Sequence, residues 1–163
     1  MKPYHKISIP NLEKIRQEVL KQLPAESLNS NDFLYLNNAV NGLLENPVLK
    51  EMSDTLGITP YLLPPALHTT LPHNTDRIHV DYGQYRYSIN IPILNYSKTY
   101  IAFYTTTIDP NPEVHPLRSE VSYGTIKLKD SKLIEMIETI DPYILDTSVP
   151  HQRSEEHTSE VQS

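Results

Sequence analysis

The sequence predicts an α+β fold in which N-terminal helices pack on a β-sandwich or jelly-roll core. Residues 1–58 place apolar side chains three and four positions apart, which is the spacing of an amphipathic helix. Residues 59–152 are instead rich in β-branched and aromatic side chains interrupted by proline and turn residues, which is typical of short strands. Helices first and strands afterwards favour α+β, and a length of 163 residues favours one domain with a single core.

Three helices are expected in the first third of the chain. The first begins after Asn11, a suitable N-cap, and ends at Pro24, because apolar residues recur between them at helical steps: Leu12, Ile15, Val19 and Leu23. A less regular helix is expected over residues 31–44. A third is expected from Asn46 and Pro47 to Gly57, with three side chains facing inward: Val48, Met52 and Leu56.

Two strands stand out in the second part of the chain. Tyr87–Ile93 alternates apolar and polar residues, and Thr99–Thr107 is rich in threonine, tyrosine and isoleucine. Residues 95–98 between them have the length and chemistry of a hairpin loop, which predicts an antiparallel pair. We further expect, in chain order, a proline-broken loop at Asp109–Glu113, a strand at Gly124–Leu128, a helix or strand at Lys132–Ile140, and a last strand at Tyr143–Val149.

Composition narrows the class of protein. The formal net charge of -6 gives no electrostatic footprint for nucleic acid or for an anionic membrane. The absence of cysteine excludes disulfides and thiolate metal sites. No apolar run approaches the length of a membrane span, and the N-terminus lacks the apolar stretch of a secretory signal. A cytoplasmic protein is therefore expected.

The last eleven residues, RSEEHTSEVQS, are expected to be a non-native, disordered tail. Apart from Val161, the string is the translation of one reading frame of a common sequencing adapter. Composition alone would also allow an ordinary polar terminus. Because an adapter accounts for the order of the residues, we favour the adapter and place the end of the natural segment near Gln152.

Three residues suggest a metal site. His79 and Asp81 lie two positions apart, so on an extended strand both side chains point to one face. His151, late in the chain, supplies a possible third ligand. Two imidazoles and a carboxylate on one side of an ion leave its other side open, which is the arrangement that non-haem Fe(II) uses in oxygen chemistry.

Simpler readings exist for these residues and their neighbours. A His-x-Asp pair arises readily by chance, and before Tyr82 and Gly83 it also fits a strand that enters a turn. His68 and His73 could form a rival zinc site with Asp76 and His79, although the spacing matches no helix-borne zinc motif. Tyr82, Tyr85 and Tyr87 could stack on single-stranded nucleic acid, but sheet packing is favoured in an acidic chain.

The context of the pair resembles a known family. The pair precedes a strand that ends in Asn90-Ile-Pro-Ile-Leu-Asn95, followed by Tyr100-Ile-Ala-Phe-Tyr104 and Asp146-Thr-Ser-Val-Pro-His151. From Tyr61 to Gln152 this run resembles the aspartyl/asparaginyl β-hydroxylase-like members of the Fe(II)- and 2-oxoglutarate-dependent dioxygenases. The resemblance implies a double-stranded β-helix of jelly-roll or cupin-like form, incomplete at the C-terminus.

The resemblance also implies roles for residues. His79, Asp81 and His151 match the iron ligands and so the catalytic centre. Asn90 falls where the family contacts 2-oxoglutarate, Ser88 shares its face, and Arg86 matches a basic or polar position near the cosubstrate or substrate. The implied activity is hydroxylation of a C–H bond in a peptidyl or small-molecule substrate, with dioxygen and 2-oxoglutarate as cosubstrates.

One feature of the family is missing from the expected native segment. The arginine that pairs with the distal carboxylate of 2-oxoglutarate belongs on the next strand, and Arg153 follows His151 too closely to replace it. We therefore expect this fragment to be poorly stable and inactive even if its parent is active. The alternatives are a non-catalytic, cupin-like jelly-roll binding module and, less favoured, a zinc hydrolase, for which no suitably spaced general base is present.

Overall fold

The structure is a computed structural model of the whole chain, and two compact units emerge from it, Met1–Ile7 with Pro72–Ser163 and Ser8–Leu71. Each unit is described by itself. The residues described are 2–22, 33–35, 47, 50–51, 54, 57, 66–68, 77–82, 86–94, 98–115 and 118–155.

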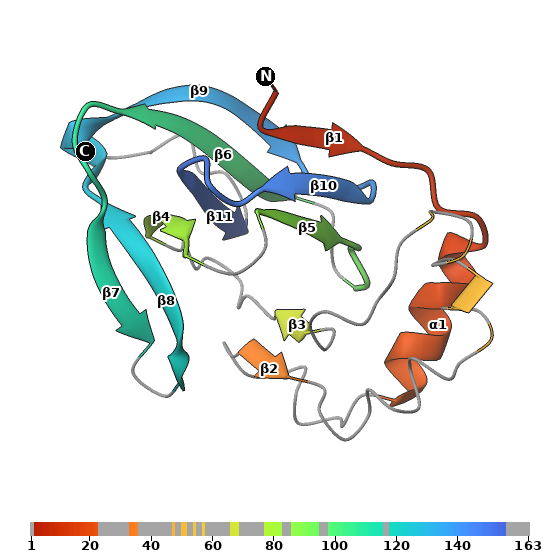
Figure 1. Cartoon of the computed structure of the whole chain (residues 1–163). Helices are drawn as coiled ribbons and strands as arrows, with labels where there is room; N and C mark the ends of the chain where they lie inside the picture. The colour runs from red at the N-terminus through yellow and green to blue at the C-terminus, as the bar shows by residue number, and fades with distance from the viewer. Residues whose placement is uncertain are drawn as a thin grey trace. The chain divides into compact units, whose positions relative to one another are not determined.

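The first expected helix is confirmed in the smaller unit, where α1 spans Leu12–Gln22 (Figure 1). The backbone carbonyl of Asn11 accepts the first helical hydrogen bond from the Ile15 amide at 3.0 Å. Asn11 has a φ of 56°, a left-handed conformation that asparagine tolerates better than most residues. Ile15 is completely buried, so the apolar face of this helix is covered.

The second expected helix is wrong where the structure describes it. Phe33–Tyr35 forms strand β2, which pairs antiparallel with β3, Ala66–His68. An aromatic and apolar triplet suits a paired strand, and this tertiary pairing overrides a weak helical pattern. The third expected helix has helical backbone at Pro47, Lys50, Glu51 and Asp54, and Gly57 follows with a φ of 64°. Its expected inward residues lie outside the described residues.

The larger unit contains two antiparallel sheets (Figure 1). The smaller sheet has the order β1-β10-β5, with strands Tyr4–Lys6, Tyr143–Asp146 and Tyr87–Asn90. The larger sheet has the order β7-β8-β4-β11-β6-β9. Its strands, in that order, are Asn111–His115, Arg118–Ile126, Ile78–Asp81, His151–Glu155, Thr99–Thr106 and Ser131–Glu138.

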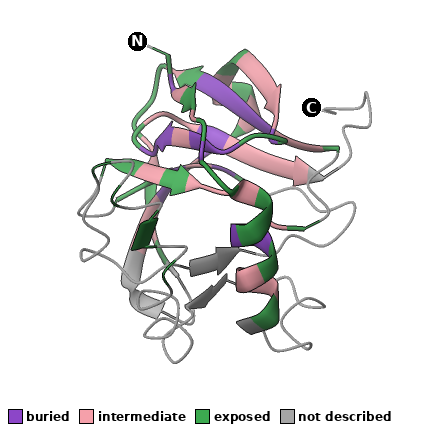
Figure 2. Cartoon of the chain, turned by 90° about the vertical axis from the view of Figure 1, so that its right-hand side faces the viewer, coloured by how far each residue is buried: buried purple, intermediate pink, exposed green. Residues whose placement is uncertain are grey.

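An apolar core joins the two sheets. Ile101 and Phe103 of β6 cluster with Tyr143 and Leu145 of β10, and the ring of Tyr4 on β1 stacks on Phe103 at 5.5 Å. Two other residues of β6, Ala102 and Tyr104, join a second cluster with Ile78 and Ile126 on the opposite face. Strand β6 is therefore buried on both faces, which its long apolar and aromatic run allows (Figure 2).

Three pairs of strands are nested along the chain. Strand β6 pairs with β9, the flanking β5 pairs with β10, and the outermost β4 pairs with β11. The pairs β4–β11 and β6–β9 lie in the larger sheet, and β5–β10 lies in the smaller sheet. The chain therefore crosses between the sheets before and after β5, and again before and after β10. This nesting brings β11 back beside β4 although about seventy residues separate them in sequence.

The expected β5–β6 hairpin is wrong, because β5 pairs with β10 and β6 lies in the other sheet. The expected loop at Asp109–Glu113 is also wrong in part, since Asn111–His115 forms β7 on an edge of the sheet, where Pro112 is tolerated. The helix-or-strand alternative at Lys132–Ile140 resolves as the strand β9.

The C-terminal segment differs from expectation in two respects. The strand expected at Tyr143–Val149 ends at Asp146, and a separate strand, β11, begins at His151. The tail expected to be disordered from Arg153 onward has its first three residues in β11, where they pair with residues 99–101 of β6. Residues 156–163 lie outside the described part of the chain.

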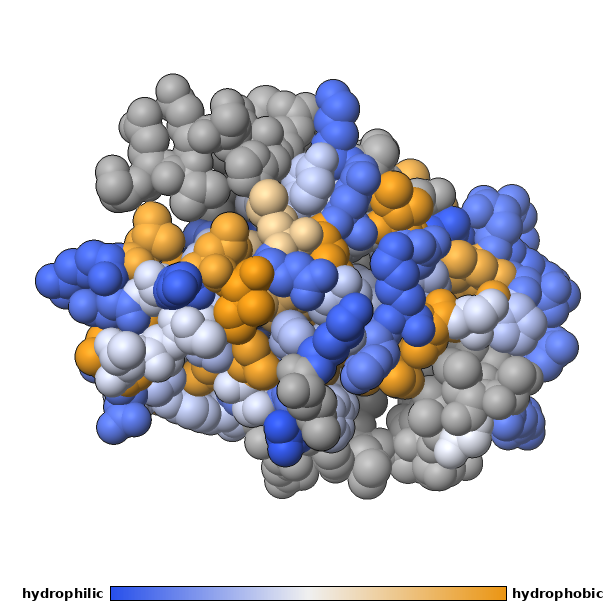
Figure 3. Space-filling view, turned by 90° about the horizontal axis from the view of Figure 1, so that it is seen from above, coloured by the Kyte–Doolittle hydropathy of each residue, from blue (hydrophilic) through white to orange (hydrophobic). Residues whose placement is uncertain are grey.

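Large exposed apolar side chains come from several strands and turns. Figure 3 shows apolar side chains interrupted by hydrophilic ones on the face it presents. Scattered exposure of this kind is ordinary for a folded protein. The exposed residues are Tyr82, Tyr87, Ile89, Leu94, Ile108, Val114, Leu133, Ile134 and Ile140. Among the described residues, no helix is long and apolar enough to cross a membrane.

Gly124 of β8 has no room for a side chain, and Gly124→Ala is expected to destabilise the fold. A Cβ there would lie 2.5 Å from both Pro110 Cβ and Tyr82 Oη. The tyrosine tip can move, but the proline is fixed to the backbone, so overpacking is expected to cost about 1–3 kcal/mol. Urea unfolding followed by circular dichroism measures the cost, and an unchanged midpoint would contradict this close packing.

Candidate metal centre

Strand β4 places two polar side chains on one face. Ile78 and Val80 are buried, whereas His79 and Asp81 alternate with them and point to the opposite side. The sequence Ile-His-Val-Asp is thus a short strand with one apolar face and one face that carries nitrogen and oxygen ligands. The expected common orientation of His79 and Asp81 is confirmed by the structure.

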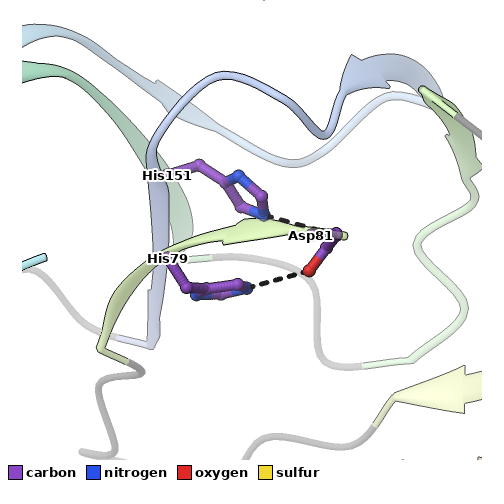
Figure 4. A group of neighbouring side chains, drawn as sticks. All are labelled: His79, Asp81 and His151. Atoms are coloured by element: carbon purple, nitrogen blue, oxygen red, sulfur yellow. Dashed lines mark ion pairs between the residues drawn. The ribbon is translucent and has the colours of Figure 1, made fainter. Parts of the chain in front are cut away.

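Strand β11 brings the third side chain to the same place. His151 lies directly opposite His79 across β4 and opposite Phe103 across β6. Residues paired in this way project from the same face of a sheet. Since Phe103 belongs to the core between the sheets, the two histidines lie on the core-facing side of the larger sheet. Figure 4 shows the three side chains converging from the two strands.

The ligand atoms of the three residues lie within 4.8 Å of one another. His79 Nε2 is 3.7 Å from Asp81 Oδ1, and His151 Nε2 is 4.0 Å from Asp81 Oδ2. The imidazole centroids are 4.4 Å apart. Ligands that share one ion at about 2.1 Å lie roughly 3 Å apart when they occupy adjacent positions. A small side-chain rotation therefore suffices for all three to bind one ion.

Backbone carbonyls orient both imidazoles. His79 Nδ1 lies 2.8 Å from the Arg77 carbonyl, and His151 Nδ1 lies 2.8 Å from the Val149 carbonyl. A carbonyl can only accept, so each Nδ1 carries a proton, and each Nε2 faces Asp81. This outer hydrogen bond fixes the tautomer and ring orientation that a metal-binding histidine requires.

Burial differs among the three residues. The side chain of His151 is 5% exposed, against 23% for His79 and 43% for Asp81. Burial, reinforced by the charges of His79 and Arg153 and opposed by the Val149 carbonyl, lowers the pKa of His151 to about 3. Loss of hydration raises the pKa of Asp81, although His79 and Arg153 oppose the rise. His151 is therefore a neutral ligand at ordinary pH, as metal binding demands.

The connection between β10 and β11, residues 147–150, contacts two of the three ligand residues. The Asp81 amide donates to the Thr147 carbonyl at 3.0 Å, and the Val149 carbonyl accepts from His151 Nδ1. The Tyr104 amide donates to the Pro150 carbonyl at 2.8 Å, which ties the connection to β6. The connection thus fixes His151 and the backbone of Asp81 together.

Asn90 and Ser88 lie on the core-facing side of the smaller sheet. They pair with Tyr143 and Leu145, both members of the core between the sheets. Asn90 Nδ2 donates to Ser88 Oγ at 2.9 Å, so the expected shared face of these two residues is observed. Arg153 links them to the metal-binding residues, because its Nη2 lies 3.5 Å from Asn90 Oδ1 and its charge acts on both Asp81 and His151.

Arg86 contacts Asp146 rather than Asn90 or Ser88. Its Nε and Nη2 donate to the Asp146 carboxylate at 2.8–3.2 Å. Contact between Arg86 and a cosubstrate or substrate stays a prediction, whereas its contact with Asp146 is observed.

Sequence reasoning missed a polar group beside His79. The Tyr123 ring meets the His79 ring edge-on, with centroids 6.3 Å apart. Glu113 of β7 accepts hydrogen bonds from Tyr123 Oη and from Thr125 Oγ1, at 3.3 and 2.7 Å. Tyr123 and Thr125 lie two positions apart, which would have indicated that both point to the same face of a strand. The expected strand begins at Gly124, because glycine often interrupts strands, and so it does not include Tyr123.

The rival readings fall partly outside the described residues. His68 lies on β3 in the smaller unit, while His73, Asp76 and Tyr85 are not among the described residues. Tyr82 and Tyr87 are 45% and 52% exposed, and Tyr87 lies on strand β5, which pairs with β10. Within the described part of the chain, His79, Asp81 and His151 form the one group of three residues able to hold a metal ion.

Comparison with protein-family models, with curated proteins and with solved structures finds no match to the chain. What the centre can do therefore rests on its geometry. Two imidazoles and one carboxylate on neighbouring strands form a set of three residues that could bind a divalent cation.

Asp146→Asn is expected to reduce stability at neutral pH and to flatten its acid dependence. Burial raises the pKa of Asp146, but hydrogen bonds from Arg86 and Ser148 outweigh burial and hold the pKa below its ordinary value of 3.8. A pKa that is lower in the folded state than in the unfolded state stabilises the fold above about pH 4, and this contribution is lost as pH falls. The expected cost at neutral pH is about 1–3 kcal/mol.

Urea unfolding from acid to neutral pH tests this expectation against Asp141→Asn. Asp141 pairs with Lys6 at 3.1 Å, and both side chains are more than half exposed. Its substitution removes the same charge from an exposed pair and is expected to cost little. Equal losses in the two variants would contradict the special role of Asp146.

Proposed function

We propose that this chain carries the metal and cosubstrate sites of an Fe(II)- and 2-oxoglutarate-dependent oxygenase, a class of enzyme that here would hydroxylate a C–H bond of a peptidyl or small-molecule substrate. The observation that carries the proposal is the convergence of His79, Asp81 and His151, with both Nε2 atoms directed toward the carboxylate. Two imidazoles and a carboxylate on one face are the ligand set of non-haem Fe(II) oxygenases.

The strand arrangement supports the proposal. We interpret the nested pairs β4–β11, β5–β10 and β6–β9 as the core of a jelly roll of the double-stranded β-helix kind. On this interpretation the outermost pair carries all three ligands, and β7 and β8 form an insertion between β6 and β9 that extends the larger sheet beside β4.

The residues present fit Fe(II) bound at this position. The neutral His151 and the oriented His79 supply nitrogen, Asp81 supplies oxygen and a negative charge, and no thiolate competes because the chain has no cysteine. Bound Fe(II) with 2-oxoglutarate would supply the oxidising chemistry, and the chain's own residues supply position and a shielded site.

Asn90 and Ser88 are the proposed cosubstrate contacts. Both face the core side of the smaller sheet, and Asn90 Nδ2 donates to Ser88 Oγ, so the two polar groups lie together. An amide and a hydroxyl can donate to a carboxylate without carrying charge. Their partners on β10, Tyr143 and Leu145, are buried, so the strand beside these two residues is shielded from water.

The first test is an anaerobic titration of the full chain with Fe(II) and 2-oxoglutarate, followed by visible absorption. Bidentate chelation of the cosubstrate gives a metal-to-ligand charge-transfer band in the parent. His79→Ala is expected to abolish the band because it removes one of three ligands. His5→Ala, which removes an exposed histidine on β1, serves as the matched control and should leave the band unchanged.

The outcomes separate the parts of the proposal. A band in the parent and in His5→Ala, but not in His79→Ala, supports the metal and cosubstrate sites. Metal binding that depends on His79 without any band would support the metal site but not the cosubstrate site, which is the result expected if the missing arginine is needed for cosubstrate affinity. A folded chain that binds no metal would refute the proposal and favour the non-catalytic jelly-roll binding module.

Asn90→Ala is expected to weaken 2-oxoglutarate binding and to leave Fe(II) binding intact. Loss of one hydrogen bond to a charged group costs about 1.5–3 kcal/mol, which is roughly a ten- to hundredfold rise in the dissociation constant. Calorimetry with the metal alone and then with the cosubstrate measures both affinities in the same sample. Unchanged cosubstrate affinity would remove Asn90 from the site.

A further inference from the structure

We propose that Asp146 is a positioning residue of the metal centre. Its carboxylate, held by Arg86, fixes the connection Thr147–Pro150, which in turn orients Asp81 and His151. This inference rests on the proposed function, since it assigns the means by which the same centre is held in shape.

Asp146 is the anchor of a dense set of hydrogen bonds. Its side chain is 6% exposed, and its carboxylate accepts three hydrogen bonds from Arg86. Oδ1 also accepts from the Ser148 amide at 3.1 Å and from Ser148 Oγ at 2.6 Å. A buried carboxylate with this many donors holds a single geometry, and it turns the chain sharply after β10.

The same residues hold the start of the connection from the other side. The Thr147 amide and its Oγ1 both donate to the Arg86 carbonyl, at 2.8 and 2.9 Å. Arg86 therefore acts twice, with its guanidinium on Asp146 and its carbonyl on Thr147. The Val149 amide donates to the Asp146 carbonyl at 3.2 Å, which closes the turn.

From this anchor two contacts lead directly to the ligands. The Thr147 carbonyl accepts from the Asp81 amide, and the Val149 carbonyl accepts from His151 Nδ1. If the anchor is removed, the Val149 carbonyl no longer holds the Nδ1 proton and His151 Nε2 loses its fixed direction. Loss of an outer-shell partner of this kind typically costs ten- to hundredfold in metal affinity.

The test compares Asp146→Asn and Arg86→Gln with Asp141→Asn in the full chain, with Co(II) alone as the probe. We expect Asp146→Asn to weaken Co(II) binding by roughly ten- to hundredfold and to change the visible Co(II) spectrum, which reports the geometry of the ligands. Arg86→Gln should act in the same direction, and Arg86→Lys should restore part of the affinity because it returns a cation to the carboxylate. Asp141→Asn should match the parent.

A second readout needs no metal. Nitrogen-15 NMR of the histidine side chains should show an Nδ1–H tautomer for His151 in the parent and its loss in Asp146→Asn. Near-ultraviolet circular dichroism establishes that each variant is folded, and Arg86→Gln replaces Asp146→Asn if the latter is not. Parent-like Co(II) binding and parent-like tautomer in a folded variant would overturn the inference. A parent that binds no Co(II) would defeat the proposed function, while the tautomer would still decide the role of Asp146.

Discussion

The pairing of His151 with His79 across β4 and β11 is the constraint on which the candidate centre depends. A shift of one residue in this register would turn His151 to the opposite face and remove it from His79 and Asp81. That pairing is a single bridge, whereas β11 is joined to β6 over five residue pairs. The register at the centre is therefore set mainly from β6, whose two faces are both buried and whose own position is firmly fixed.

The connection between β10 and β11 fixes the position of His151 more firmly than the single β4–β11 bridge could alone. The chain leaves one sheet at Asp146 and enters the other at His151, and such a crossing exposes backbone groups that no strand can satisfy. Here those groups are paired with Arg86, Asp81, Tyr104 and His151. The hydrogen bonds that the backbone loses on leaving the smaller sheet are thus replaced by contacts that also fix Asp81 and His151. The stability of this crossing and the geometry of the candidate centre therefore depend on the same contacts.

Local patterns in the sequence predicted some parts of the structure well. The spacing of apolar residues gave α1, the β-branched run gave β6, and the two-residue step placed His79 and Asp81 on one face. Long-range pairing could not be read in the same way. The hairpin expected between β5 and β6 failed because adjacency in sequence is only a tendency, and β5 pairs with a strand more than fifty residues later. The turn at Asp146-Thr147-Ser148 could have been predicted from the sequence, because an aspartate side chain often accepts a hydrogen bond from the backbone amide two residues later.

The three ligands divide into a fixed part and an accessible part. His151 is almost completely buried and held neutral, and His79 is partly covered by Tyr123, so neither ring is readily displaced. Asp81 is the most exposed of the three, and its carboxylate lies between both Nε2 atoms. The two imidazole nitrogens would coordinate a bound ion from the buried side, and the ion would be open to solvent on the side of the Asp81 carboxylate. Exchange of ligands is therefore expected on the side of Asp81 rather than through the core.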